Sequence, residues 1–198
     1  MSAKLLHSVR EMQKHFLHGG IKYCLVGGLA VSARVGERTT KDIDFAISVS
    51  TESEAENIVK YLISCGLKVD SLLEHKQTKK LCTVRLKFVE GPKYYIDLLF
   101  SASGVEAEVV RTSTELELLP DFFLPVATVP SLLAMKLVSV DADRRPNDVA
   151  DINTLITSLN SEEYAETIVL LETITKRGLN RGRDLKGMLE DRVRLLKE

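Results

Sequence analysis

The chain has few cysteines and almost no net charge, and each absence excludes a class of protein. Its three cysteines, Cys24, Cys65 and Cys82, are too few and too widely spaced for a disulfide framework or a zinc-binding pattern. We expect them to be reduced thiols in a core. The formal net charge is −1 at pH 7, so no overall basic field draws the protein to nucleic acid.

The chain also lacks long apolar runs, repeats and low-complexity tracts. Its first residues do not have the apolar centre of a signal peptide, and no stretch reaches the roughly 20 apolar residues of a spanning helix. We therefore expect a cytoplasmic protein with no membrane partner. A chain of 198 residues and 22.1 kDa can bury one substantial core, as one domain or as a domain with a small appendage.

The most informative segment begins with a pair of glycines. An apolar run at 22–26 predicts a buried strand, Gly27 and Gly28 end it, and residues 29–35 begin a helical pattern. Glycines at such a turn allow the backbone to approach a phosphate, and the free N–H groups of the helix face it. This segment is therefore a candidate phosphate-binding turn.

Two alternating carboxylates follow the glycine pair. A second strand is predicted at 43–49, and Asp42 and Asp44 lie at its start. Because side chains at i and i+2 of a strand share a face, these carboxylates project together, while Ile43 and Phe45 enter the core. Two acidic oxygen ligands on one strand suit Mg²⁺, which keeps other positions for substrate phosphates.

The glycine pair, the spacer at 29–41 and the sequence Asp42-Ile43-Asp44 together resemble the signature of the nucleotidyltransferase superfamily, which has the polymerase-beta-like fold. The residues Arg-Thr-Thr-Lys at 38–41 are most similar to the AbiEii-type nucleotidyltransferase toxins and their uncharacterised relatives. The resemblance implies an α/β (α+β) fold with a mixed sheet flanked by helices and a C-terminal helical subdomain. It also implies an enzyme that uses an NTP and Mg²⁺ (or Mn²⁺).

By the same resemblance, Asp42 and Asp44 are catalytic metal ligands, and Gly27, Gly28 and Arg38 bind the nucleotide. Ser32 and Arg34 are weaker candidates for phosphate contacts. The alternative is a plain turn followed by a solvated strand face. Asp is depleted in strands, which favours a functional role for the pair.

A third carboxylate stands alone in a later apolar strand. Residues 83–89 alternate between apolar and basic, turn residues follow, and 94–100 form a returning strand that contains Asp97. A lone buried charge is costly unless it is paired or metal-bound. The resemblance implies that Asp97 is the third catalytic residue, acting as general base and sharing the metal. The alternative is a core Asp paired with Arg85 or Lys87.

Glu106 and Glu108 are weaker candidates for that third carboxylate. Further on, the order of Lys136, an arginine pair at 144–145, Asp148 and Asp151 is similar to a segment of the toxin family. There the lysine faces the nucleotide phosphates and the later aspartate holds it, so the resemblance assigns Lys136 and Asp148 to nucleotide binding. Asn147 departs from the pattern, because a basic residue often stands there. The alternative for Lys136 is a surface lysine whose stem covers apolar neighbours.

The other patterns give the expected organisation. We expect a nucleotidyltransferase-like core at 1–128 and a C-terminal helical subdomain at 129–198. The expected elements are helices at 5–18 and 51–65, strands at 67–73 and 80–89, an outer hairpin from 105–111 and 114–118, a short strand at 124–128, and helices after residue 130.

The expected partners follow from the resemblance. A nucleoside monophosphate would pass to a hydroxyl of a tRNA end, a protein or a small molecule such as an antibiotic, and an antitoxin protein would be the partner of a toxin. A second hypothesis is a non-catalytic nucleotide-binding or interaction module on the same fold; the complete set of three aspartates favours the enzyme. The C-terminal basic residues form either a solvated face or a surface for an acidic partner or RNA; they are Lys176, Arg177, Arg181, Arg183, Lys186, Arg192 and Arg194.

Overall fold

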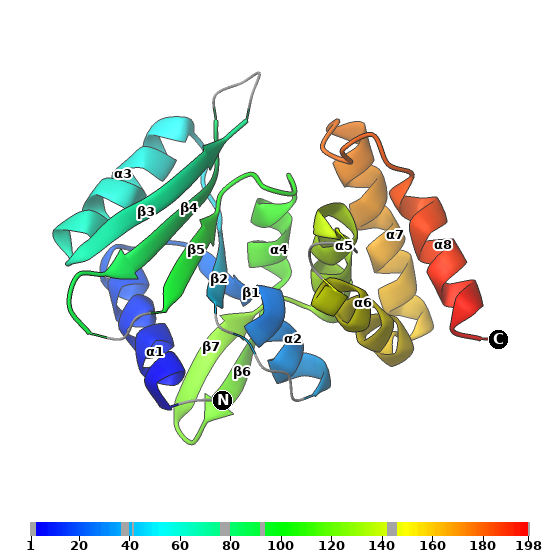
Figure 1. The fold of residues 1–198 in the computed structure, drawn as a ribbon, viewed down its shortest axis with the longest axis horizontal. Coiled ribbons are helices and arrows are strands. Elements are labelled where there is room, and N and C mark those ends of the chain that lie inside the picture. Colours follow the sequence, from blue (N-terminus) through cyan, green and yellow to red (C-terminus); the bar gives the residue numbers. More distant parts are fainter. Residues whose placement is uncertain are drawn as a thin grey trace.

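The computed structural model describes residues 3–36, 40, 42–75, 80–91, 94–141 and 146–197. Figure 1 shows a twisted sheet with helices around it and a group of helices from the C-terminal part of the chain at its side. In chain order the elements are α1 (Ala3–His18), β1 (Tyr23–Val26), α2 (Gly27–Val35), β2 (Asp42–Ile47), α3 (Glu52–Ser64), β3 (Leu67–Glu74), β4 (Leu81–Phe88), β5 (Tyr95–Leu99), α4 (Glu106–Thr112), β6 (Thr114–Leu119), β7 (Phe122–Val126), α5 (Val129–Ser139), α6 (Pro146–Ser158), α7 (Ser161–Lys176) and α8 (Leu185–Leu195).

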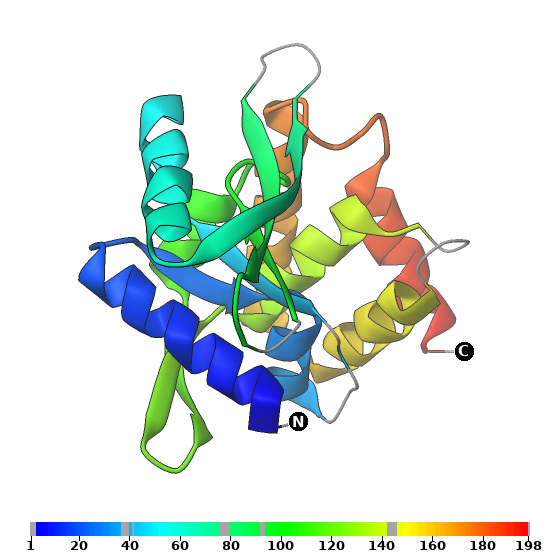
Figure 2. The ribbon, with the colours of Figure 1, turned by 60° about the vertical axis from the view of Figure 1, so that its left-hand side comes forward.

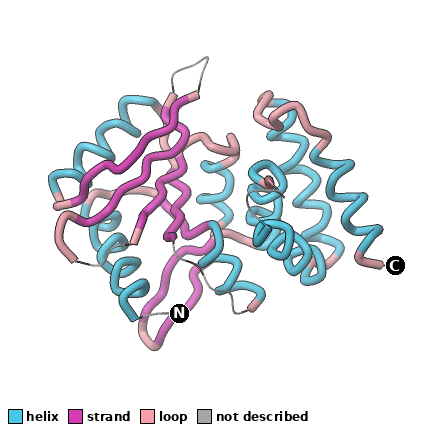
Figure 3. The backbone as a smooth tube through the Cα atoms, viewed as in Figure 1, coloured by secondary structure: helices cyan, strands magenta, loops and turns pink. Residues whose placement is uncertain are grey.

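The strands of the described part of the chain, magenta in Figure 3, form one mixed sheet. Their order is β3-β4-β5-β2-β1-β7-β6. β2 and β5 are parallel neighbours, while β1 runs antiparallel to β2 and β4 runs antiparallel to β5. The strands that carry the predicted catalytic aspartates therefore lie side by side near the centre of the sheet. The mixed sheet flanked by helices confirms the predicted fold class.

One face of the sheet is covered by α1 and α3. Phe16 of α1 lies with its ring centroid 4.4 Å from that of Tyr23 and 5.0 Å from that of Phe45. Thr51 caps α3 by accepting a hydrogen bond from the Glu54 N–H. This aromatic and aliphatic packing fixes β1 and β2, and with them the carboxylates on the opposite face.

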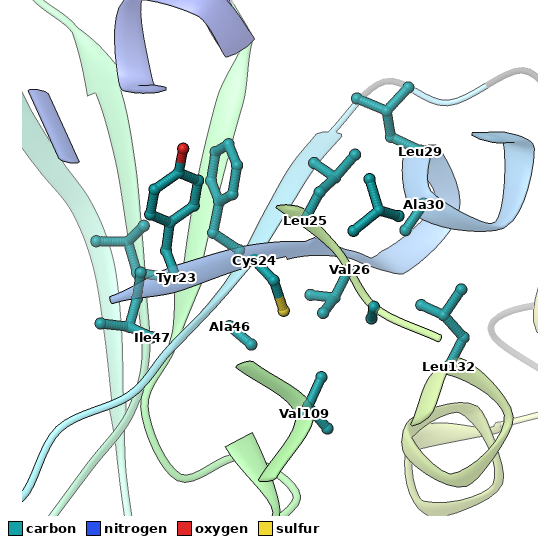
Figure 4. Packing of buried hydrophobic residues seen from close by; sticks show 14 of the residues in the cluster. Tyr23, Cys24, Leu25, Val26, Leu29, Ala30, Ala46, Ile47, Val109 and Leu132 are labelled. Atoms are coloured by element: carbon teal, nitrogen blue, oxygen red, sulfur yellow. The ribbon is translucent and has the colours of Figure 1, made fainter. Parts of the chain in front are cut away.

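The opposite face is covered in part by α4 and by the C-terminal helices. Figure 4 shows Val109 of α4 lying toward Cys24 and Ala46, and Leu132 of α5 lying near Val26. Helix α5 packs against α2, α6 and α7, so it contacts both the core and the C-terminal helices. Figure 1 shows α5 between the sheet and the last two helices, and Figure 2 shows α8 (red) next to α5.

The outer hairpin predicted from 105–111 and 114–118 is wrong in its first half. Residues Glu106–Thr112 form helix α4, and Thr114–Leu119 pairs instead with β7. The valines of α4 suggest a strand, but Val105 and Val109 are four residues apart and both are buried. The Glu106 carboxylate also accepts hydrogen bonds from the Ser103 and Gly104 N–H groups, which fixes the start of this helix.

The predicted division at residue 129 remains a prediction. Helix α5 begins at Val129 with Thr128 as its N-cap, so an element boundary does lie there. The helix nevertheless packs directly on α2 of the core. None of the helices within the described residues combines the length and the apolar character that crossing a membrane requires.

Candidate active site

The register of four neighbouring strands places the candidate side chains in one row. Val26 lies opposite Asp44, Asp44 opposite Asp97, and Asp97 opposite Arg85. Directly opposed residues share a face of a sheet, and neighbouring strands are about 4.8 Å apart. Asp42, two residues before Asp44, projects to the same face. The structure therefore brings all three predicted catalytic aspartates together, with a basic residue at the end of the row.

The first glycine of the pair is required by the carboxylate that it faces. Gly27 has φ +66°, and a Cβ added to it would lie 2.0 Å from Oδ2 of Asp44. Helix α2 begins at Gly27 itself, and its N-cap residue Val26 supplies no capping side chain. Gly27 and Gly28 line the same cavity as the aspartates. The helix N-terminus therefore lies beside the carboxylates, as the candidate phosphate-binding turn requires.

Asp97 forms a two-point ion pair with Arg85. Nε of Arg85 donates to Oδ1 at 2.7 Å and Nη2 donates to Oδ2 at 2.6 Å, while Nη2 lies 3.8 Å from Oδ2 of Asp42. The pairing that the sequence offered as an alternative role for Asp97 is thus present. Within the described residues no group of three His, Cys, Asp or Glu side chains is placed to hold a metal ion. A metal ion shared by Asp97 would bind at the lone pairs that Arg85 leaves open on the two carboxylate oxygens.

The carboxylates of the row are not fully balanced by cations. Burial, followed by the charges of Asp97 and Asp42, raises the pKa of Asp44 to about 7. Lys136 and Arg85 act in the opposite direction without cancelling this shift. Asp42 and Asp44 thus form a site of excess negative charge that fits a hard divalent cation. The same charges, and above all the hydrogen bond to Asp97, raise the pKa of the Arg85 guanidinium.

A second charged group joins α5 to α6. Nζ of Lys136 lies 2.5 Å from Oδ1 of Asp148 and 2.8 Å from Oδ2 of Asp151. The Lys136 side chain is only 12% exposed, which excludes the surface-lysine alternative. Lys136 and Asp148 line the cavity that contains the aspartate row. Asp151, which was not among the predicted site residues, is the second carboxylate that pairs with the lysine.

The cavity has a volume of about 520 Å³ and lies between the sheet, α2, α5, α6 and the connection from α7 to α8. Every predicted site residue except Arg38 lines this cavity. Arg38 and the arginine pair at 144–145 lie outside the described residues. Sequence reasoning did not place Arg85, Arg181, Asn147 and Thr40 in this cavity. The alternation of apolar and basic residues at 83–89, just before the Asp97 strand, was the sequence signal that could have placed Arg85 in the cavity.

Three weaker candidates have other contacts. Arg34 donates to the carbonyl oxygens of Val126 and Ala127, so it ties α2 to the end of β7. Glu106 accepts hydrogen bonds from the loop that precedes α4, and Glu108 pairs with Arg177 of the C-terminal segment. Ser32 is not among the residues that line the cavity. The structure thus gives these charged side chains structural contacts.

The fold is shared with known nucleotidyltransferase structures. A nucleotidyltransferase-like antigenic protein from Paracoccidioides brasiliensis superposes with a TM-score of 0.55 at 18% identity, over 96% of this chain and 93% of that chain. The antibiotic-resistance factor ANT(2″)-Ia, in complex with adenylyl-2″-tobramycin, superposes with a TM-score of 0.55 at 16% identity, over 87% and 98% of the two chains. A search of curated protein sequences finds no match.

The sequence itself matches a family model. The family is described as the nucleotidyl transferase AbiEii toxin of a type IV toxin–antitoxin system, and the match covers residues 17–197. This range includes the glycine pair, the aspartate row, Lys136 and the connection that carries Arg181. With this match over nearly the whole chain, and with the site geometry above, the protein belongs to the AbiEii family of nucleotidyltransferases.

Proposed function

We propose that this protein transfers a nucleoside monophosphate from an NTP to an acceptor hydroxyl, with Asp42 and Asp44 holding a divalent metal ion. The observation that carries the proposal is the row in which Asp44 and Asp97 lie opposite each other on parallel strands. A bound Mg²⁺ or Mn²⁺ would neutralise and orient the phosphates of the nucleotide. The excess negative charge around Asp44 supports a cation at this position.

The reaction is a substitution at the α-phosphorus. The acceptor oxygen forms a bond to that phosphorus, the bond to the bridging oxygen breaks, and pyrophosphate leaves. The proton of the acceptor hydroxyl passes to a carboxylate, and we assign this role to Asp97. Arg85 donates one hydrogen bond to each Asp97 oxygen, so each oxygen keeps a lone pair that can accept the proton.

Two groups are placed to bind the phosphates of the NTP. The first N–H groups of α2 at Gly27 and Gly28 line the cavity and suit an anion. The Lys136 ammonium has three donors, of which two point to Asp148 and Asp151. Its third donor can reach a phosphate oxygen, so we assign Lys136 and Asp148 to nucleotide binding. Arg38 remains a candidate for nucleotide binding on the basis of the sequence alone.

The family description supports a further proposal about partners. A toxin of a toxin–antitoxin system is expected to bind an antitoxin protein, and we propose this for the present chain. The acceptor is an RNA, a protein or a small molecule. ANT(2″)-Ia, which shares the fold, is described in complex with adenylyl-2″-tobramycin, which is a nucleotidylated antibiotic.

The test separates nucleotide binding from transfer. Calorimetry with Mg-NTP should show binding to the wild type and little binding to the double variant Asp42→Asn/Asp44→Asn. Asp191→Asn, on the exposed surface of α8, is the matched control and should bind like the wild type. A labelled-NTP assay then follows the label onto RNA, protein or small-molecule acceptors. Binding without transfer to any acceptor would favour the non-catalytic module.

A further inference from the structure

The carboxylate of Asp148 has an acceptor that the described part of the protein leaves unused. The side chain is only 7% exposed, and the residue lines the cavity. Oδ1 accepts a hydrogen bond from Nζ of Lys136 at 2.5 Å, whereas Oδ2 is buried and has no hydrogen-bond partner among the described residues. A buried acceptor without a partner costs free energy, and few such groups occur in folded proteins. An unused acceptor in the wall of a cavity points to a donor on the ligand.

The ion pair with Lys136 does not by itself explain where Asp148 lies. Asp151, three residues later on α6, has Oδ2 at 2.8 Å from the same Nζ, and its side chain is 5% exposed. Asp151 is not among the residues that line the cavity. Two carboxylates of α6 therefore hold one ammonium, and of these two only Asp148 is also placed to contact a ligand.

The charges around Asp148 decide which kind of ligand group can bind it. A phosphate oxygen carries a charge of the same sign as the carboxylate, so the two repel. A metal ion at this carboxylate would lie beside the Lys136 ammonium, whose Nζ is 2.5 Å from Oδ1 and repels another cation. A hydroxyl or amino group carries no charge and supplies the missing proton. The acceptor therefore fits a neutral hydrogen-bond donor.

The closeness of Lys136 favours a donor on the sugar of the nucleotide. In the proposed function the third donor of Lys136 contacts a phosphate, and another of its donors is bonded to Asp148. A group bound to Asp148 is thus separated from that phosphate only by one ammonium and one carboxylate. In a nucleotide the sugar joins the phosphates to the base, so its hydroxyls come within this reach before the base does. The torsion about the Cβ–Cγ bond of aspartate is soft, so either oxygen can turn toward the cavity.

We propose that the Asp148 carboxylate accepts a hydrogen bond from a ribose hydroxyl of the NTP and thereby selects the sugar. This inference rests on the proposed function and assigns sugar recognition to one residue of the same site. One oxygen of Asp148 orients Lys136, and the other acceptor reads the sugar. A site that hydrogen-bonds a substrate hydroxyl rejects the analogue that lacks it, because its own polar group is then left unpaired.

The first measurement uses the wild type alone. Calorimetry in Mg²⁺ identifies the NTP that binds most tightly, and the titration is repeated with the 2′-deoxy and 3′-deoxy forms of that nucleotide. One of the two analogues should bind roughly ten- to hundredfold more weakly, as expected for the loss of a hydrogen bond to a charged group. The weaker analogue names the hydroxyl. Equal affinities for all three forms would show that no sugar hydroxyl is read and that the proposal is wrong.

The second measurement compares Asp148→Ala with the matched variant Asp151→Ala. Each removes one carboxylate from Lys136 and leaves the other, so the lysine keeps a partner and both proteins should fold, which melting curves check. Asp148→Ala should bind the ribonucleotide and the weaker analogue about equally. Asp151→Ala should keep the wild-type ratio of these two affinities, including where both affinities fall. A role of Asp148 through Lys136 alone predicts the same ratio in both variants.

Asp148→Asn keeps the shape of the side chain and serves where the alanine variant does not fold. Its neutral amide accepts a weaker hydrogen bond than a carboxylate, so the ratio should also fall toward one. A wild-type ratio in a folded Asp148 variant would contradict the proposal. A changed preference among the four bases, with the sugar ratio unchanged, would place the carboxylate at the base and equally contradict it.

Failure of the proposed function gives different results. A wild type that binds no Mg-NTP would contradict the metal and phosphate contacts, and the sugar contact with them. A wild type that distinguishes the sugars but transfers no label to any acceptor would be the non-catalytic module, with the role of Asp148 supported. Binding of NTP without sugar discrimination would contradict the role of Asp148 alone.

Discussion

At the scale of single residues, the site depends on a missing side chain as much as on the charged ones. Gly27 permits the Asp44 carboxylate to lie against the start of α2, since a Cβ there would come within 2.0 Å of Oδ2. The sequence pattern predicted a close approach of the backbone to a phosphate. The structure adds that the side chain closest to an added Cβ at this glycine is Asp44.

Gly27→Ala should therefore lose Mg-NTP binding as well as stability. The left-handed backbone alone costs about 1 kcal/mol in an alanine, and the collision with Asp44 adds to it. Gly20→Ala is the matched control, because Gly20 has φ +62° and nothing within 4 Å of an added Cβ. Chemical denaturation and calorimetry of both variants give the comparison. Normal nucleotide binding by Gly27→Ala would show that the Asp44 position is unimportant.

Asp97→Asn should separate chemistry from binding. The amide cannot accept the proton of the acceptor, and loss of a general base typically costs ~10²–10⁴-fold in rate. Asp97 lies on a different strand from Asp42 and Asp44, so most nucleotide affinity should remain. Single-turnover transfer and nucleotide titration measure the two effects. Unchanged turnover would assign Asp97 to a structural role with Arg85.

At the scale of elements, α5 and α6 are joined by buried charges. The Asp148 and Asp151 side chains that hold Lys136 are 7% and 5% exposed. Removing one member of such a group leaves uncompensated charge in the interior. The lysine therefore has two roles, one in the proposed phosphate contact and one in holding the helices together.

Lys136→Met should destabilise the protein by about 3–5 kcal/mol, because two carboxylates lose their cation. The triple variant Lys136→Met/Asp148→Asn/Asp151→Asn should recover much of the lost stability, because the two unpaired carboxylates are also removed. Both proteins should bind NTP weakly. Urea denaturation of the two variants and the wild type provides the measurement. Equal stability of the single and triple variants would mean that these charges are not coupled.

Helix α4 and the C-terminal segment are joined by a pH-sensitive contact. The hydrogen bond from Arg177 lowers the pKa of Glu108 below its ordinary value of 4.5. Since the folded pKa is the lower one, this stabilisation is present above about pH 4.5 and is lost as the pH falls through the folded pKa. The pair is partly exposed, so its contribution is at most about 1 kcal/mol.

Glu108→Gln should lower the melting temperature slightly at pH 7 and have a smaller effect near pH 3. Glu172→Gln, an exposed position on α7, is the control and should follow the wild type at both values. Thermal melts of the three proteins across this range give the result. A difference that stays constant with pH would exclude the ionised pair as its cause.

Local patterns predicted most elements and the aspartate row because strand alternation and the glycine turn are properties of neighbouring residues. They failed where distant residues decide the outcome. α4 was misread because its valines favour a strand, while the hydrogen bonds that hold Glu106 at its start come from the backbone of the preceding loop. Arg181 was assigned to a basic tail because only the packing of Leu179 on Gly104 brings it to the cavity.

At the scale of the whole molecule, the cavity is lined by residues from nearly the full length of the chain. A ligand that binds there contacts the core and the C-terminal helices together. Binding to the folded state alone raises stability with the logarithm of ligand concentration. Ligand binding should therefore raise the stability of the entire protein.

Mg-NTP should raise the melting temperature of the wild type, with EDTA reversing the metal-dependent part. At a ligand concentration one hundred times the dissociation constant, the free energy of unfolding rises by about 2.7 kcal/mol. The double variant Asp42→Asn/Asp44→Asn should show little of this increase. Without ligand it should be at least as stable as the wild type, since crowded like charges are removed. A similar ligand effect in both proteins would place the metal elsewhere.

Arg181 follows all the other residues that line the cavity in the sequence, and this order has a consequence for protein synthesis. The glycine turn and the Asp42 strand leave the ribosome before Lys136, and the α7–α8 connection is made after all of them. A nascent chain that stops before α7 has the aspartates but lacks one wall of the cavity. Unfinished chains should therefore be unable to transfer a nucleotide.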